Sequence, residues 1–235
     1  MCGVVVIVTR WWLVWVLASV ACLMALLGAN LSPSWLIGPT SLPHPAQDNL
    51  PHTLTGIQGG GVRASPSLGL WLRCTVRAGD VRGARPPLRC GVYATRVPDL
   101  PAAQVAALVG VAAGTVLAAW SCVAVVSATC VRLVKGRSWF TIIGITQAVA
   151  GVLSLAGVAL FPLAWNSPRA RFQCGPEADL YYPSWCIVGW ATYATLAGSV
   201  GLLLCSCLAS IAARSTTADE VTQEINKGST VVILV

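Results

Sequence analysis

Four long apolar segments constrain this chain more than any other feature of its sequence. Each is long enough to cross a bilayer as a helix. The segments are residues 11–31, 102–131, 139–164 and 187–212. Only 10% of the residues are charged, whereas about a quarter of a soluble globular domain is. The sequence therefore predicts a multi-pass membrane protein with four transmembrane helices in contact with the lipid bilayer.

The first apolar segment could be a transmembrane helix or a signal peptide. Arg10 and the Trp11-Trp12 pair stand at its start, and such residues favour the headgroup region of a membrane. A signal peptide has a shorter apolar core and ends at a small-residue cleavage site, which is not evident before Pro33. We expect a retained helix that is preceded by residues 1–10.

The distribution of basic residues predicts the orientation of the helices. The short turn 132–138 is basic, and Arg10 and Arg214 flank the first and fourth helices on the same side. By the positive-inside rule this side is cytoplasmic, so residues 32–101 and 165–186 form outer loops. The first outer loop is rich in arginine, but loops above about 60 residues are translocated largely regardless of charge. We expect a plasma-membrane protein with both termini in the cytoplasm.

Four of the ten cysteines lie in the two outer loops, where oxidation is permitted. They are Cys74, Cys90, Cys174 and Cys186. Four cysteines allow three pairings, of which Cys74 with Cys90 and Cys174 with Cys186 is local and leaves no thiol over. A disulfide bond typically contributes about 2–4 kcal/mol by limiting chain entropy. The cysteines are too scattered for a zinc site, and we expect no metal and no cofactor.

The apolar segments contain no Asp, Glu, Lys or Arg between their ends. Transporters and ion pathways usually carry intramembrane charges. The strongest polar groups in these segments, Gln104 and Gln147, are expected to bridge helices. No nucleophile–base set is evident, and the net charge of +7 does not gather in a patch that would bind nucleic acid. The sequence favours a protein that is not an enzyme.

The second apolar segment carries a small residue at every fourth position. On a helix these residues form one smooth face, which lets a neighbouring backbone come close. They are Ala106, Gly110, Gly114 and Ala118. We expect this face to pack within the bundle; a homodimer contact is the alternative.

The tail, residues 213–235, ends in the apolar run VVILV. Such an extended end can add a strand to the groove of a PDZ domain, with Ile233 and Val235 in alternate pockets. The alternative is a segment that lies on the membrane surface.

A tryptophan, a Gly-Leu-Trp turn and two cysteines follow one another in the first outer loop. This order resembles the W…GLW…C…C signature of the claudin and peripheral-myelin-protein superfamily. The matching residues are Trp35, Gly69, Leu70, Trp71, Cys74 and Cys90. The resemblance implies an all-α membrane protein, a left-handed four-helix bundle that carries a small antiparallel extracellular β-sheet. It also implies that the two motif cysteines pair and that a tryptophan sits in the mouth of the bundle.

Further residues are similar to the lipoma-fusion-partner-like (LHFPL) tetraspan branch of that superfamily. They are residues 32–38 (SPSWLIG), Phe161-Pro162, Trp165-Asn166-Ser167 and residues 190–193 (WATY). This resemblance covers all four helices and both outer loops. It implies an auxiliary subunit that aids the assembly or trafficking of a larger channel or receptor in the same membrane. A claudin-like adhesion or paracellular barrier protein is the alternative.

Trp35 and Trp71 are expected to be structural anchors first and partner contacts second. An indole ring can fill the apolar end of a helix bundle while its N–H reaches the polar boundary. Exposed arginines of the same loop are better candidates for contact with a partner, since unpaired basic side chains steer acidic partners. The candidates are Arg73, Arg77, Arg82, Arg85 and Arg89. A solvated basic surface is the alternative.

Overall fold

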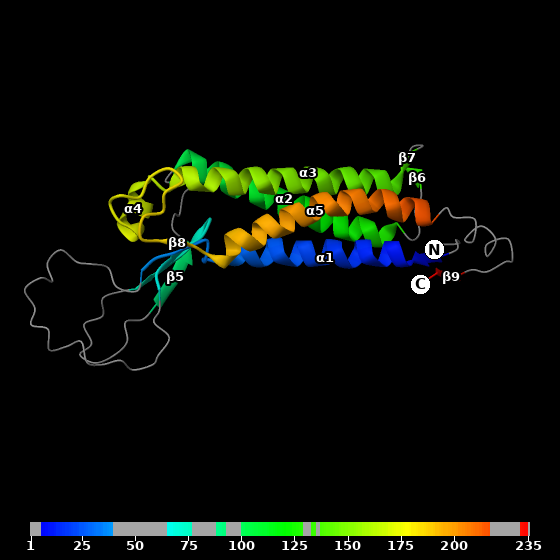
Figure 1. Cartoon of the computed structure of the whole chain (residues 1–235), viewed down its shortest axis with the longest axis horizontal. Coiled ribbons are helices and arrows are strands. Elements are labelled where there is room, and N and C mark those ends of the chain that lie inside the picture. Colours follow the sequence, from blue (N-terminus) through cyan, green and yellow to red (C-terminus); the bar gives the residue numbers. More distant parts are fainter. Residues whose placement is uncertain are drawn as a thin grey trace, which may run out of the picture.

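A computed structural model of the chain contains four long helices that lie side by side (Figure 1). They are α1 (Arg10–Leu31), α2 (Ala102–Ser127), α3 (Trp139–Leu160) and α5 (Trp190–Ser215). The 3₁₀ helix η3 (Phe161–Ala164) continues α3 directly. The four helices are long and apolar enough to span a membrane. The structure describes residues 6–39, 65–76, 88–92, 100–128, 133–134, 137–216 and 231–234.

Two helix ends differ from the segments that hydropathy suggests. Helix α2 ends at Ser127, where the Trp139 indole N–H of α3 reaches both the Ser127 hydroxyl at 3.0 Å and the Ala124 carbonyl at 3.2 Å. The Ala124 carbonyl also accepts the Ala128 N–H at 3.0 Å, so the indole shares this carbonyl with the backbone at the end of α2. Helix α5 begins at Trp190 because the two residues Ile187–Val188 form the strand β8.

A five-stranded sheet lies at one end of the helix bundle, which we call the sheet end (Figure 1). Its other strands are β2 (Leu36–Ile37), β3 (Ser67–Leu68), β4 (Leu72–Val76) and β5 (Leu88–Val92). The order across the sheet is β5-β4-β3-β2-β8, and every pair is antiparallel. The short helix α4 (Pro168–Cys174) lies at the same end. The predicted fold, four apolar helices with a small antiparallel sheet, is confirmed.

The opposite end, which we call the termini end, holds two further pairs of strands. Strand β1 (Val6–Thr9) pairs in parallel with β9 (Val231–Leu234), and β6 (Leu133–Val134) pairs with β7 (Arg137–Ser138). The first and last described segments of the chain, β1 and β9, therefore lie side by side at this end (Figure 1). The β1–β9 pair was not predicted from the sequence, because its strands are more than 200 residues apart.

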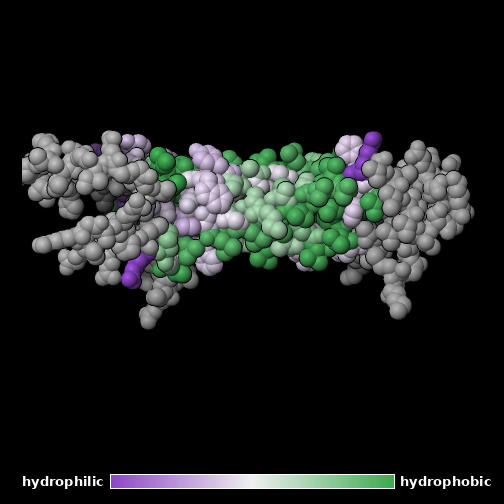
Figure 2. Space-filling model, turned by 90° about the horizontal axis from the view of Figure 1, so that it is seen from below, coloured by the Kyte–Doolittle hydropathy of each residue, from purple (hydrophilic) through white to green (hydrophobic). Residues whose placement is uncertain are grey.

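Apolar side chains cover the middle of the described helices (Figure 2). Exposed tryptophans stand near both ends of this band: Trp11 and Trp120 toward the termini end, and Trp71 and Trp190 toward the sheet end. Indole rings favour the boundary between hydrocarbon and water. Their positions are those expected if the apolar band crosses the bilayer.

The helices approach closely where glycines face a neighbour. Helix α3 packs between α2 and α5, and α1 packs against α5 and α2. A Cβ atom at Gly114 would clash with the Ser154 side chain and lie 2.7 Å from the Ala150 carbonyl oxygen. A Cβ atom at Gly110 would lie 3.2 Å from the Gly157 Cα. In lipid, helices associate largely through such close packing.

A buried polar network joins the diagonal helices α1 and α3. The Trp15 indole N–H donates to Gln147 Oε1 at 3.0 Å, and Gln147 Nε2 donates to Ser19 Oγ at 2.8 Å. All three side chains are fully buried. Because an unsatisfied amide in a lipid-embedded core costs several kcal/mol, this network fixes how α1 and α3 face each other across the bundle axis.

Ala118 is buried like Gly114, whereas Ala106 is exposed. Gly114→Val is therefore expected to lower the free energy of unfolding by about 1–3 kcal/mol, the usual cost of overpacking. Ala106→Val is the matched control, about two turns away on the same helix, and should be near neutral. A denaturing-detergent titration measures both variants. Equal losses would contradict packing of this face against α3 and favour a contact between copies of the chain.

Candidate functional site

The sheet is attached to the bundle through Trp35. This indole is fully buried and donates from Nε1 to the Ala29 carbonyl at 2.9 Å, at the end of α1. It meets the Phe161 ring of η3 edge-on, with 5.1 Å between centroids. The Trp35 carbonyl accepts the Gly189 N–H at 2.8 Å and the Thr192 hydroxyl at 3.1 Å, at the start of α5. One residue thus ties three helices together directly before β2.

The Gly-Leu-Trp motif forms the turn between β3 and β4. A Cβ atom at Gly69 would lie 2.7 Å from the Ser32 carbonyl and 2.9 Å from Pro33 Cα, so the turn touches the end of α1 so closely that only glycine fits. Leu70 is fully buried beneath the turn. Trp71 is 40% exposed, and its indole N–H donates to the Asn30 carbonyl at 2.8 Å.

The two tryptophans of the motif thus occupy different positions. Trp35 fills the mouth of the bundle, as the resemblance implies for one tryptophan, and Trp71 lies at its rim. Gln104, which we expected to bridge helices, donates from Nε2 to the Leu70 carbonyl at 2.9 Å. This hydrogen bond links α2 to the turn and provides a donor for the buried Leu70 carbonyl.

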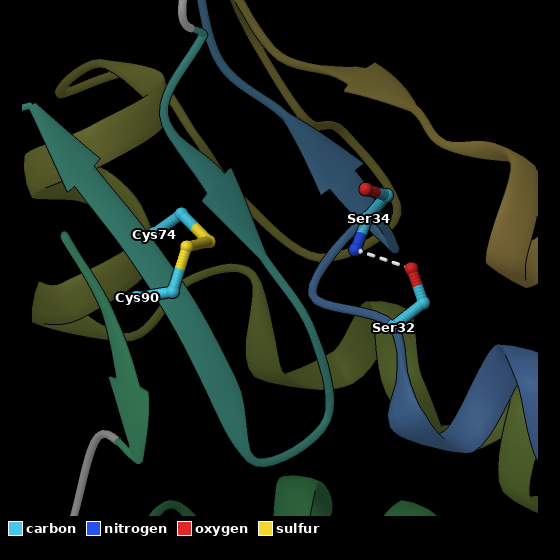
Figure 3. The surroundings of a disulfide bond; sticks show 4 residues. All are labelled: Ser32, Ser34, Cys74 and Cys90. Atoms are coloured by element: carbon cyan, nitrogen blue, oxygen red, sulfur yellow. Dashed lines mark hydrogen bonds between the residues drawn. A yellow bond between two sulfur atoms is a disulfide. The ribbon is translucent and has the colours of Figure 1, made fainter. Parts of the chain in front are cut away.

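Two disulfide bonds hold the segments that surround the sheet. The Cys74–Cys90 bond joins directly paired residues of β4 and β5, close to the turn in which the Ser34 N–H donates to Ser32 Oγ (Figure 3). The Cys174–Cys186 bond joins the end of α4 to the residue before β8. Both are the local pairings, and they close the loops of a domain too small to bury a large core of its own.

Helix α4 lies in the segment 165–186, which the sequence analysis treated as a loop. Ser167 caps its start by accepting the Ala170 N–H at 3.4 Å, and Pro168 occupies the first helical position. The helix ends at Gly175, whose φ of +104° suits glycine. Serine, proline and a terminal glycine are the usual start and stop signals of a helix, so the sequence does contain a signal for α4.

Two of the five candidate arginines lie in the described part of the sheet. Arg73 pairs with Gly91 and Arg89 pairs with Thr75, so both arginines point away from the face that carries the Cys74–Cys90 bond. Both side chains are exposed. The described strands of this sheet contain no acidic residue. This face, which we call the basic sheet face, can therefore attract an acidic surface. Arg77, Arg82 and Arg85 lie outside the described residues.

The remaining candidates from the sequence are the two residues of the C-terminal tail. Ile233 belongs to β9, and Val235 lies outside the described residues. Among the described residues, no group of three or more His, Cys, Asp or Glu side chains could hold a metal ion.

Gln104→Leu is expected to loosen the Gly-Leu-Trp turn, because the buried Leu70 carbonyl loses its donor at a cost of about 1–3 kcal/mol. Faster amide hydrogen exchange at residues 67–76 measures this effect. Ala106→Leu, an exposed position on the same helix, is the control and should leave exchange unchanged. Unaltered exchange in Gln104→Leu would show that Gly69 and Trp71 hold the turn without the Gln104 amide.

The comparisons with known proteins agree with this architecture. The family model described as lipoma HMGIC fusion partner-like protein matches residues 12–214. The chain is 30% identical over 230 residues to LHFPL tetraspan subfamily member 2a protein of Danio rerio, covering 97% of this chain and 98% of that protein. It is also 30% identical over 232 residues to LHFPL tetraspan subfamily member 2 protein of Homo sapiens, with 97% and 98% coverage. With its four apolar helices and its disulfide-bonded sheet, the chain belongs to the lipoma HMGIC fusion partner-like tetraspan family.

Proposed function

We propose that this protein is an auxiliary subunit that binds a larger channel or receptor in the same membrane and aids its assembly or trafficking. The observation that carries the proposal is a groove between α3 and α5, which we call the α3–α5 groove. Its volume is about 220 Å³. It is lined largely by small residues and hydroxyls, among them Thr141, Gly144, Ala148, Ser206, Ala209 and Ser210.

The composition of this groove suits a transmembrane helix of a partner. Gly144 is buried against Ser206 and Ala209 of α5, so it brings α3 and α5 together at the base of the groove. The small side chain of the half-buried Ala148 leaves room for a partner's backbone to come close, which is how helices associate in lipid. The Ser206 and Ser210 hydroxyls donate to carbonyls of their own helix, at 2.6 and 2.7 Å, and their oxygens retain lone pairs that can accept a bond from another helix. Interhelical hydrogen bonds of this kind are worth about 0.6–2 kcal/mol in a bilayer.

The interior of the bundle is filled by side chains, which supports an auxiliary role and argues against a pore within the bundle. The large side chains of Trp15, Leu26 and Leu202 are fully buried along the bundle, together with Gln147. The four spans carry no charge between their ends, and ion pathways usually carry one. We therefore place the action of the protein on a surface that faces neighbouring membrane proteins and not in a channel through the bundle.

The experiment compares two variants in mild-detergent affinity purification from cells. Ala148→Leu fills the α3–α5 groove and is expected to reduce recovery of a membrane-protein partner severalfold. Ala156→Leu places the same side chain on the same helix at an exposed position outside the groove, and should retain wild-type recovery. Equal recovery with both variants, or no membrane partner with the wild type, would overturn the proposal.

We further propose that the sheet end is extracellular, at the plasma membrane, and that both termini are cytoplasmic. The Cys74–Cys90 and Cys174–Cys186 bonds at the sheet end support this orientation, because disulfide bonds persist in oxidising compartments. The basic turn that contains Arg137 lies at the termini end, which the positive-inside rule favours as the cytoplasmic side.

A PDZ domain is the proposed partner of the tail, with Ile233 and Val235 as its contacts. Strand β9 already pairs with β1 along one edge, so a PDZ domain would pair with the other edge or displace β1. In the purification above, deletion of residues 231–235 should remove a PDZ protein while leaving the membrane partner bound to the α3–α5 groove.

The basic sheet face supports a second candidate function, claudin-like adhesion or a paracellular barrier. Arg73 and Arg89 point to one side at the sheet end, where they would favour anions between cells. Expression in cells that lack junction strands should then raise transepithelial resistance or form strands. The double substitution Arg73→Gln and Arg89→Gln should reduce the preference for anions. Unchanged resistance without strands would exclude this candidate.

A further inference from the structure

A group of large apolar side chains is exposed on α4 and on the turn that follows it. We call this group the aromatic face; it consists of Phe172, Leu180, Tyr181, Tyr182 and Trp185. Phe172 is 84% exposed and Tyr181 is 62% exposed. Isolated apolar side chains on a surface need no explanation, but a group of aromatic ones marks a contact with protein or membrane.

These side chains belong to one braced unit. The Arg171 Nε of α4 donates to the Ala178 carbonyl at 3.0 Å, and Asp179 and Tyr182 form a β-bridge. The Trp185 ring covers Gly175, where a Cβ atom would lie 2.8 Å from it. The Cys174–Cys186 bond closes the segment. The aromatic face is thus held in place by the fold.

Tyr181 places this unit against the side of α3. Its hydroxyl donates to the Ala159 carbonyl at 2.9 Å, and its N–H reaches the Pro162 carbonyl at 3.4 Å. Its φ of +58° is rare for a bulky residue and needs such contacts to persist. Ala159 is the last member of an exposed stripe along α3, which consists of Ile145, Val149, Val152, Ala156 and Ala159. The aromatic face therefore continues the surface of α3 that faces lipid.

The length of α3 indicates how deep in the bilayer the contact between Tyr181 and Ala159 lies. From Trp139, the first residue of α3, to Ala159 the helix rises about 30 Å, which is the thickness of the hydrocarbon core. If Trp139 lies at one boundary, the Tyr181 hydroxyl lies at the other. Tyrosine and tryptophan concentrate at that depth, where the ring is in contact with acyl chains and the polar atom is in contact with headgroups.

We propose that the aromatic face binds the phospholipid bilayer itself, at the boundary between headgroups and acyl chains on the side of the sheet end. Arg171 is exposed beside Phe172 and supplies a cation that suits the lipid phosphate. The contact fixes the segment 165–186 against the membrane and leaves the basic sheet face as the surface that points into the aqueous space. The inference does not depend on the proposed auxiliary role.

The test uses the full chain in phosphatidylcholine nanodiscs. Trifluoromethyl-phenylalanine is incorporated singly at Phe172, at Tyr182 and, as a control, at Glu177, an exposed residue of the same segment. Fluorine NMR then measures relaxation by dissolved oxygen, which concentrates in the bilayer, and by a water-soluble nickel chelate. Mass analysis of the intact Cys174–Cys186 bond verifies that each variant is folded.

A severalfold higher ratio of oxygen to nickel relaxation at Phe172 and Tyr182 than at Glu177 is the expected result. A ratio equal to that at Glu177 would place the aromatic face in water, and would overturn the proposal in favour of a protein partner. Protection of both aromatic positions from oxygen and nickel alike would also overturn it, because a second copy of the chain would then cover the face.

Discussion

The sheet end depends on the burial of one indole, that of Trp35. The strands of the sheet are two to five residues long, and so small a sheet is marginal without packing against other elements. Trp35 supplies that packing, because it is buried against Phe161 while its carbonyl binds the start of α5. Strand β2 follows it directly and lies between β3 and β8. The pairing of the whole sheet therefore starts from a position that the bundle fixes.

The bundle itself is held by close approach and by a few buried polar contacts. Gly114 of α2 lets the backbone of α3 come near, and Gln147 connects α3 to Trp15 on the opposite side of the axis. Both kinds of contact suit a lipid environment, because burying apolar surface between helices contributes little free energy of association there. The bundle is therefore a rigid support. If the helices moved past one another, side chains at the close approaches would clash or the Gln147 amide would lose its hydrogen bonds.

The most recognisable residues of the chain are thus structural, and the surfaces available to partners lie elsewhere. Trp35, Gly69 and Leu70 are buried. Three separate surfaces remain in the part of the chain that the structure describes: the basic sheet face, the α3–α5 groove and the aromatic face. In the proposals above, they face water, a partner's transmembrane helix and lipid headgroups, respectively. The proposed auxiliary role would allow all three to be used at once.

The sequence by itself determined the four helices, because hydropathy and segment length are local properties of the chain. It allowed three pairings of the four loop cysteines, of which the local one is found, and the resemblance of its cysteine and tryptophan motif to a known family implied the small antiparallel sheet. It also contained the capping signals of α4, which are local too. Only the tertiary structure decided that Trp35 is buried while Trp71 lies at the rim, and that Gln104 binds the Leu70 carbonyl. The β1–β9 pair and the α3–α5 groove likewise arise from residues far apart in sequence, whose contacts no local pattern encodes. The residues of the aromatic face are close in sequence, but their exposure and the contact of Tyr181 with α3 depend on the tertiary structure.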